Sequence, residues 1–392
     1  MGEFLDYSYK GFNYKLYVPS DYQEETEFPL MVLLHGCHQN PDDFAAGTKM
    51  NQLAEQENFL VLYPNMKQLF NPLNLSDYNP FGCWNWFLDN NQHRDMGHPK
   101  FIYTLINEVT RNYRVDSNKV FAAGLSAGAA LACILGVTYP DVFNGIGVCA
   151  GLPYGAANVS FLTDPMAKAA SESMQQGVSD PFACGNSAFE EMGRFRKKMP
   201  VIVFHGICDT IVHPINAQQV IIQWIQTNFL INGGKGKADV TPMFVKSDFM
   251  NGKSYTQHVY SDGCDNPLLE LWMIDQMGHT WSGGSPNGSY TDPLGPNATE
   301  IIWNFFKRSS QTPVERSGLL EHPGRIEQPA QPEQFEHPKL PAPSEQFEYP
   351  GQPAPSEQFV PLEQPEQSEQ HAGPAKKNLF RTLLEKLFKK RR

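Results

Sequence analysis

One serine stands in a context that makes it a candidate nucleophile. Ser126 is the centre of the pentapeptide 124–128, which reads Gly-Leu-Ser-Ala-Gly. The apolar run Val120–Ala123 precedes it and the helix-forming stretch 129–135 follows, so the pentapeptide lies at a strand–turn–helix junction. The alternative is a glycine-rich helix entry with a capping serine. The junction favours a strained turn whose exposed hydroxyl attacks a carbonyl carbon.

A serine hydroxyl becomes an effective nucleophile only when a base removes its proton. In folds built around this turn, the order along the chain is serine, then acid, then histidine. His279 lies late in the chain, in the glycine-bracketed segment 278–284 that follows the last strand-like run. Its competitors fit less well, because His258 lies on an alternating strand and His205 comes too close to the candidate acid. We therefore expect His279 to be the base.

The acid that orients the base should follow a strand between Ser126 and His279. Asp209 lies in the loop after the apolar run 201–204, where open parallel sheets place catalytic groups. Asp275 is the competing acid, but it stands only four residues before His279 and is expected to lie on the strand itself. We prefer Asp209.

Two backbone N–H groups are needed to stabilise the oxyanion of an acyl-transfer reaction. The residue after the nucleophile, Ala127, supplies one of them. The second is expected from the segment 35–39, directly after the apolar run 30–34, and the amide of Cys37 is our candidate. His35 could also be read as a catalytic histidine, but its early position in the chain favours a role in building this loop.

The elements that must hold these residues alternate between strand and helix patterns, which predicts an α/β fold with a doubly wound, mostly parallel sheet. Continuous apolar runs are typical of strands that are buried on both faces. Strands are expected at 14–18, 30–34, 59–63, 120–123, 201–204 and 269–274, and helices at about 43–57, 98–113, 127–138, 214–228 and 297–307.

The motifs together resemble the esterase family of polyhydroxybutyrate depolymerase type, which belongs to the α/β-hydrolase fold and also includes feruloyl and acetylxylan esterases. Its five motifs occur in order at 35–39 (HGCHQ), 83–87 (CWNWF), 124–128 (GLSAG), 205–214 (HGICDTIVHP) and 278–284 (GHTWSGG). The resemblance implies a Ser126, Asp209 and His279 triad. It implies hydrolysis of a polyhydroxyalkanoate polyester or its oligomers, with a feruloyl or acetylxylan ester as the alternative. A non-catalytic surface-coating protein is a more remote alternative.

Two further features depend on residues within these motifs. Cys37 and Cys83 both lie inside them, so a disulfide that braces the oxyanion loop is expected if the protein is exported, with Cys208–Cys264 as a weaker second pair. Buried free thiols are the alternative. Three tryptophans are candidates for an apolar wall of the substrate site, since an indole offers a broad flat face, although core packing would also account for them: Trp84, Trp86 and Trp281.

Composition divides the chain into three parts. Residues 1–310 carry the strand and helix patterns, whereas 311–375 hold 13 prolines and 11 acidic residues and are expected to form a disordered linker with a twelve-residue repeat. Residues 376–392 contain eight basic residues and one apolar helical stripe. We expect this tip to bind an anionic membrane or a polyester granule; docking back on the body is the alternative.

Charge and motif content exclude several function classes. The formal net charge of −11 disfavours nucleic-acid binding. Neither a dinucleotide fingerprint, nor a phosphate-binding loop, nor a metal-ligand pattern is present, so we expect no cofactor and no metal. No apolar run approaches the length of a membrane span. The first residues lack the pattern of a signal peptide, which predicts a cytoplasmic or granule-associated protein although the family is mostly exported. The sequence leaves the oligomeric state undetermined.

Overall fold

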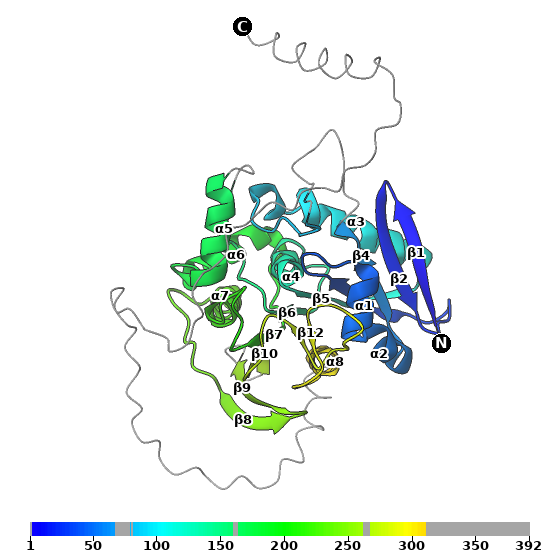
Figure 1. Ribbon diagram of the computed structural model, residues 1–392. Helices are drawn as coiled ribbons and strands as arrows, with labels where there is room; N and C mark the ends of the chain where they lie inside the picture. The colour runs from blue at the N-terminus through cyan, green and yellow to red at the C-terminus, as the bar shows by residue number, and fades with distance from the viewer. Residues whose placement is uncertain (1, 67–78, 80, 160–163, 262–266, 311–392) are drawn as a thin grey trace, which may run out of the picture. The chain divides into compact units, whose positions relative to one another are not determined.

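A computed structural model describes residues 2–66, 79, 81–159, 164–261 and 267–310. Within these residues a ten-stranded sheet forms the centre of the molecule, and helices cover both of its faces (Figure 1). The expected linker 311–375 and basic tip 376–392 lie outside the described residues. None of the described helices is long and apolar enough to cross a membrane.

The strands are β1 Glu3–Tyr9, β2 Phe12–Val18, β3 Phe28–Leu34, β4 Leu60–Pro64, β5 Val115–Leu125, β6 Ile146–Cys149, β7 Val201–Gly206, β8 Phe244–Met250, β9 Lys253–Ser261, β10 Pro267–Ile274, β11 Trp281–Ser282 and β12 Thr291–Asp292. The helices are α1 Pro41–Thr48, α2 Met50–Glu57, α3 Gly97–Asn112, α4 Ala127–Thr138, α5 Asp164–Gln176, α6 Pro181–Met192, α7 Ile215–Ile231 and α8 Ala298–Ser309.

The strand order is β1-β2-β4-β3-β5-β6-β7-β10-β9-β8. The six central strands from β4 to β10 run parallel, and antiparallel strands flank them on each side. The expected doubly wound, mostly parallel α/β fold is therefore confirmed. Since the carboxyl ends of parallel strands meet at one edge of a sheet, the loops after β3, β5, β7 and β10 are brought together there.

Each face of the sheet packs against its own set of helices. Along β3, Leu30, Val32 and Leu34 join the hydrophobic cluster that contains α3, α4 and α7. The intervening Met31 and Leu33 join the second cluster, with α1, α2 and α8. Alternate side chains of a strand point to opposite faces, so an uninterrupted apolar run fits a strand that is buried on both sides.

Several elements depart from the sequence expectation. The single helix expected at 43–57 is two helices, because Lys49 takes a left-handed conformation with φ 57° between them. The short strand β6 and the helices α5 and α6 were not anticipated. The helix expected at 127–138 has those bounds in the structure.

Candidate active site

Ser126 lies at the turn between β5 and α4, in a backbone conformation with φ 57° and ψ −120° that side-chain-bearing residues rarely adopt. Its N–H donates a 2.9 Å hydrogen bond to the carbonyl of Cys149. A Cβ atom on Gly128 would lie 2.1 Å from the Leu34 carbonyl oxygen, and one on Gly124 would lie 2.5 Å from the carbonyl carbon of Gly128. The close approach of β3 to this turn therefore accounts for Gly128, and the close approach of the first turn of α4 accounts for Gly124.

Asp209 and His279 come together from the loops after β7 and β10, which are neighbouring parallel strands. The imidazole Nδ1 of His279 lies 2.7 Å from Oδ2 of Asp209. The Asp209 carboxylate is buried, and the side chain of His279 is only 7% exposed. This contact fixes the ring of His279 and directs its Nε2 away from the acid.

The Asp209 carboxylate is held by four contacts. Its Oδ1 accepts the N–H groups of Ile211 and Val212, each at 2.9 Å, while Oδ2 lies 3.2 Å from Nε2 of His205 as well as contacting His279. Burial by itself would raise the pKa of Asp209, but the hydrogen bonds from the two histidines outweigh it and hold this pKa well below its usual range. The lowered pKa of Asp209 stabilises the folded state. This stabilisation is complete at pH values above the ordinary carboxyl pKa, and it is lost as the pH falls from there toward the lowered pKa of Asp209.

The buried His205 has a defined role that the sequence did not indicate. Its Nε2 lies 2.8 Å from the carbonyl oxygen of Val212. Because a carbonyl oxygen only accepts, this nitrogen carries a proton, which it shares with Oδ2 of Asp209. The spacing of four residues between His205 and Asp209 disfavours His205 as the base. The same short spacing is the sequence signal that could have indicated a contact between His205 and Asp209.

The loop after β3 abuts the turn that carries Ser126. A Cβ atom on Gly36 would lie 3.3 Å from the Leu125 carbonyl oxygen and 3.5 Å from Cβ of Ser126. The Gly36 N–H donates to Oε1 of Gln39, whose amide nitrogen donates in turn to the Ser289 carbonyl. These contacts hold the backbone around Cys37 beside Ser126.

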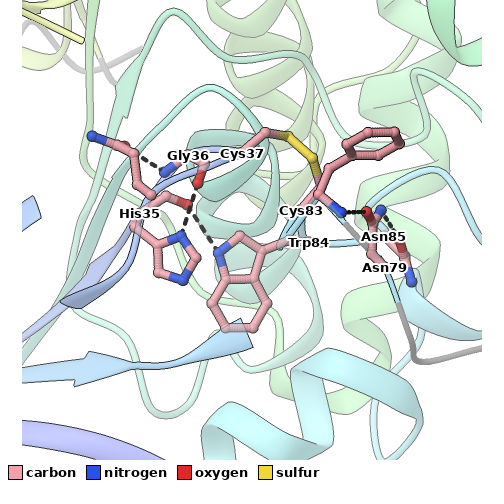
Figure 2. The surroundings of a disulfide bond; sticks show 9 residues. His35, Gly36, Cys37, Asn79, Cys83, Trp84 and Asn85 are labelled. Atoms are coloured by element: carbon pink, nitrogen blue, oxygen red, sulfur yellow. Dashed lines mark hydrogen bonds between the residues drawn. A yellow bond between two sulfur atoms is a disulfide. The ribbon is translucent and has the colours of Figure 1, made fainter. Parts of the chain in front are cut away.

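A disulfide between Cys37 and Cys83 braces the same loop from the other side (Figure 2). Next to it, the indole N–H of Trp84 donates a 3.0 Å hydrogen bond to the carbonyl of His35. The disulfide expected from the resemblance is thus present. For the second pair, Cys208 is an exposed free thiol and Cys264 lies outside the described residues.

We expect the loss of this disulfide to cost both stability and activity. The bond joins cysteines 46 positions apart, for which loop-closure entropy gives about 4 kcal/mol. Serine at both Cys37 and Cys83 should lower the free energy of unfolding in urea by roughly that amount, and should slow ester hydrolysis because the loop beside Ser126 loosens. Cys208→Ser is the control, and equal unfolding curves for the two proteins would contradict the expectation.

A cavity of about 200 Å³ opens at the junction of these loops. Ser126, His279 and Cys37 all line it. Apolar side chains from α5, from the Asp209 loop and from the loop before β12 complete its wall: Met174, Ile211 and Tyr290. These three were not anticipated, since they come from separate segments without a shared motif. Among the described residues no cluster of side chains is arranged to hold a metal ion.

The expected tryptophan wall is corrected by the structure. Trp84 and Trp281 are fully buried and Trp86 is 5% exposed, and none of the three lines the cavity. The indole N–H of Trp281 donates to the Thr299 hydroxyl, and its ring packs edge-on against Phe44. The three indoles therefore belong to the core, where each ring covers apolar neighbours.

The competing residues lie elsewhere. His258 is on β9, opposite Leu271 of β10, and Asp275 is an exposed residue whose N–H donates to the carbonyl of Ser254. His35 is buried, with Nδ1 directed to the Gly36 carbonyl and Nε2 accepting the Met66 N–H, so it has the expected role in building the loop.

Comparison with known proteins places this geometry in a family. The family model described as Esterase PHB depolymerase matches residues 12–243, which is more than half of the 392-residue chain. This chain belongs to the Esterase PHB depolymerase family. The family assignment made from the five motifs is thereby confirmed.

Relatives of this Esterase PHB depolymerase family member are named for several different esterase activities. It is 31% identical over 253 residues to poly(3-hydroxyalkanoate) depolymerase C of Paucimonas lemoignei, a match covering 64% of this chain and 54% of that protein. It is 26% identical over 267 residues to feruloyl esterase B of Thermothelomyces thermophilus, covering 67% and 82%. The chain thus spans about half the length of the depolymerase.

Among solved structures, the acetyl xylan esterase from Aspergillus awamori matches with a TM-score of 0.59 and 20% identity. The match covers 78% of this chain and all of that chain. At this identity the likeness shows a shared fold, which agrees with the α/β-hydrolase architecture expected for an Esterase PHB depolymerase chain.

Proposed function

We propose that this protein is a serine esterase in which Ser126 is the nucleophile, His279 the general base and Asp209 the residue that orients the base. The 2.7 Å contact between His279 and Asp209, beside a cavity that Ser126 lines, is the observation that carries the proposal. With Nδ1 of His279 engaged by the acid, Nε2 is the nitrogen available to accept the serine proton.

The reaction follows the acyl-enzyme route. Ser126 Oγ attacks the ester carbonyl carbon while His279 takes its proton, and the amides of Cys37 and Ala127 donate to the oxyanion. This attack forms a tetrahedral intermediate. Its collapse breaks the bond to the alcohol, which leaves with the proton from His279. Water, activated by the same histidine, then releases the acid and restores Ser126.

The substrate we propose is a polyhydroxyalkanoate polyester or its oligomers. The cavity of about 200 Å³ is smaller than the roughly 300–1,000 Å³ of sites that enclose drug-sized ligands, which suits a short acyl unit. Its apolar side chains, Met174 and Ile211, match an aliphatic chain. A feruloyl or acetylxylan ester is the second candidate, since a feruloyl esterase and a probable acetylxylan esterase are also similar to this chain.

A panel of esters tests this choice. We expect the highest kcat/KM on hydroxybutyrate oligomers, a clear rate on p-nitrophenyl butyrate, and much lower rates on methyl ferulate and acetylated xylan. A preference for methyl ferulate would assign the protein to the feruloyl class, and a preference for acetylated xylan to the acetylxylan class. Ser126→Ala serves as the blank for every substrate.

The segments beyond the described residues keep the roles proposed from their sequence. The acidic, proline-rich 311–375 would tether the enzyme, and the basic stripe of 376–392 would bind a polyester granule or an anionic membrane. Full-length and 1–375 proteins are compared by co-sedimentation with granules and with anionic vesicles. Equal partitioning of the two would remove this role.

We expect His205 to support turnover through Asp209. Leucine at this position removes a hydrogen bond to a carboxylate, worth about 1.5–3 kcal/mol, which corresponds to a tenfold to hundredfold fall in kcat. Glutamine places an N–H donor where Nε2 lies and should recover most of the rate. His98→Leu is the control, because His98 is equally buried but packs against Trp84. Equal kcat for the leucine and glutamine variants would contradict this role.

A further inference from the structure

The strand β8 forms one edge of the sheet, and β9 is its neighbour among the described strands. Figure 1 shows the β8–β9 hairpin at the end of the sheet. All seven residues of Phe244–Met250 are exposed, so both faces of the strand are open to solvent. An edge strand also leaves a row of backbone N–H and C=O groups without a strand partner, which is a template for pairing with another chain.

This edge is unusually apolar. Phe249 is 66% exposed, and Phe244 and Val245 are about half exposed. Together with Met250 they make four apolar residues out of seven, placed as one pair at each end of the strand. A cluster of exposed apolar side chains is typical of an interaction surface.

The hairpin is held rigidly. Asn251 and Gly252 form a two-residue turn with φ 45° and 84°, and Met250 pairs directly with Lys253 across it. The turn is fixed to a distant loop, because the Asn251 side chain donates to the Pro293 carbonyl and its own carbonyl accepts the Gly295 N–H. The edge therefore presents a preformed register to a partner.

We propose that β8 pairs antiparallel with β8 of a second copy of this chain, about a two-fold axis that passes by Ser247. The strand reads Phe-Val-Lys-Ser-Asp-Phe-Met, so the axis sets Lys246 of each copy opposite Asp248 of the other. The same axis sets Val245 opposite Phe249 and Phe244 opposite Met250. Ser247 then faces Ser247 on the axis, and every other cross-strand pair is of opposite charge or of two apolar residues, as favourable pairing requires.

The charges already lie in suitable positions. Within one copy Lys246 and Asp248 form an ion pair, and each side chain remains about half exposed. They lie on the same face of the strand, so each ion can exchange its partner along the strand for one across the axis without a change of backbone. The other edge strand, β1, does not have such self-complementary charges. A two-fold axis at the centre of β1 would set Asp6 of one copy against Asp6 of the other.

Sedimentation velocity of the full-length protein over a concentration series tests the proposal. The wild-type chain should approach twice its 44.1 kDa mass as concentration rises. Lys246→Glu places a carboxylate opposite Asp248 at two symmetric positions, and Asp248→Lys places an ammonium opposite Lys246. Each variant should weaken self-association at least roughly tenfold, because like charges directly opposite each other repel.

Charge exchange distinguishes this register from a general loss of contact. The double variant Lys246→Glu/Asp248→Lys should recover the dimer, and so should an equimolar mixture of the two single variants, because all facing charges are then opposite. Hydrolysis of a soluble ester by each variant should match the wild type, which shows that the fold is intact. A wild-type monomer throughout the series, a dimer insensitive to both single variants, or failure of both rescues would overturn the proposal.

Discussion

Replacing Ser126 with alanine is expected to reduce ester hydrolysis by a factor on the order of 10⁶ in kcat, as loss of the nucleophile does in serine triads of this kind. In the proposed mechanism the hydroxyl oxygen forms the acyl bond, and the strained turn between β5 and α4 places Ser126 in one cavity with His279. Alanine removes that atom without adding volume, so the fold should be unchanged.

Turnover of p-nitrophenyl butyrate and circular dichroism of the same preparation measure this effect. Ser117→Ala is the matched control, because Ser117 is an exposed serine on the same strand. The control should retain the wild-type rate. A Ser126→Ala rate above a few per cent of wild type, in a preparation free of contaminating esterase, would remove Ser126 from its proposed role.

The second large effect is expected at Asp209. Asparagine there should lower kcat by roughly 10⁴ while KM changes little. The side-chain oxygen of asparagine satisfies the N–H groups of Ile211 and Val212, which leaves its NH₂ group facing Nδ1 of His279. Nδ1 must then accept, so the proton moves to Nε2 and that nitrogen no longer serves as a base.

Asp275→Asn is the matched control for this variant. Asp275 is the competing candidate for the orienting acid, and the structure leaves it exposed, after β10 and outside the cavity. Its kcat should remain close to wild type. If instead Asp275→Asn lost most of the activity while Asp209→Asn kept it, the orienting acid would be Asp275.

The sequence predicts the central elements well because their patterns are local. Leu30–Leu34 is uninterrupted and apolar, and the structure buries it between two helix layers. The helix after Ser126 begins at the residue that the pentapeptide implies. By contrast, the break between α1 and α2 depends on a left-handed lysine, Lys49, which no residue preference signals.

The composition of the site was harder to anticipate because it depends on distant contacts. An indole fits a substrate wall and a protein core equally well. Full burial, together with the hydrogen bonds to Thr299 and to the His35 carbonyl, shows that Trp281 and Trp84 are core residues. The wall that lines the cavity instead includes Met174 of α5, a helix that was not expected. The contact of His205 with Asp209 likewise became visible only when β7 and its loop were in place.

The most direct measurement of the central claim is covalent labelling of the full-length protein with a fluorophosphonate, followed by peptide mass spectrometry. A serine activated by a histidine attacks this phosphorus centre, expels fluoride and keeps the phosphonyl group on its oxygen. The account predicts one phosphonyl group per chain, located on Ser126, with loss of hydrolysis in proportion to labelling and greatly slowed labelling in Asp209→Asn. Labelling at another residue, or an undiminished rate of ester hydrolysis by protein that is fully labelled at Ser126, would contradict the account.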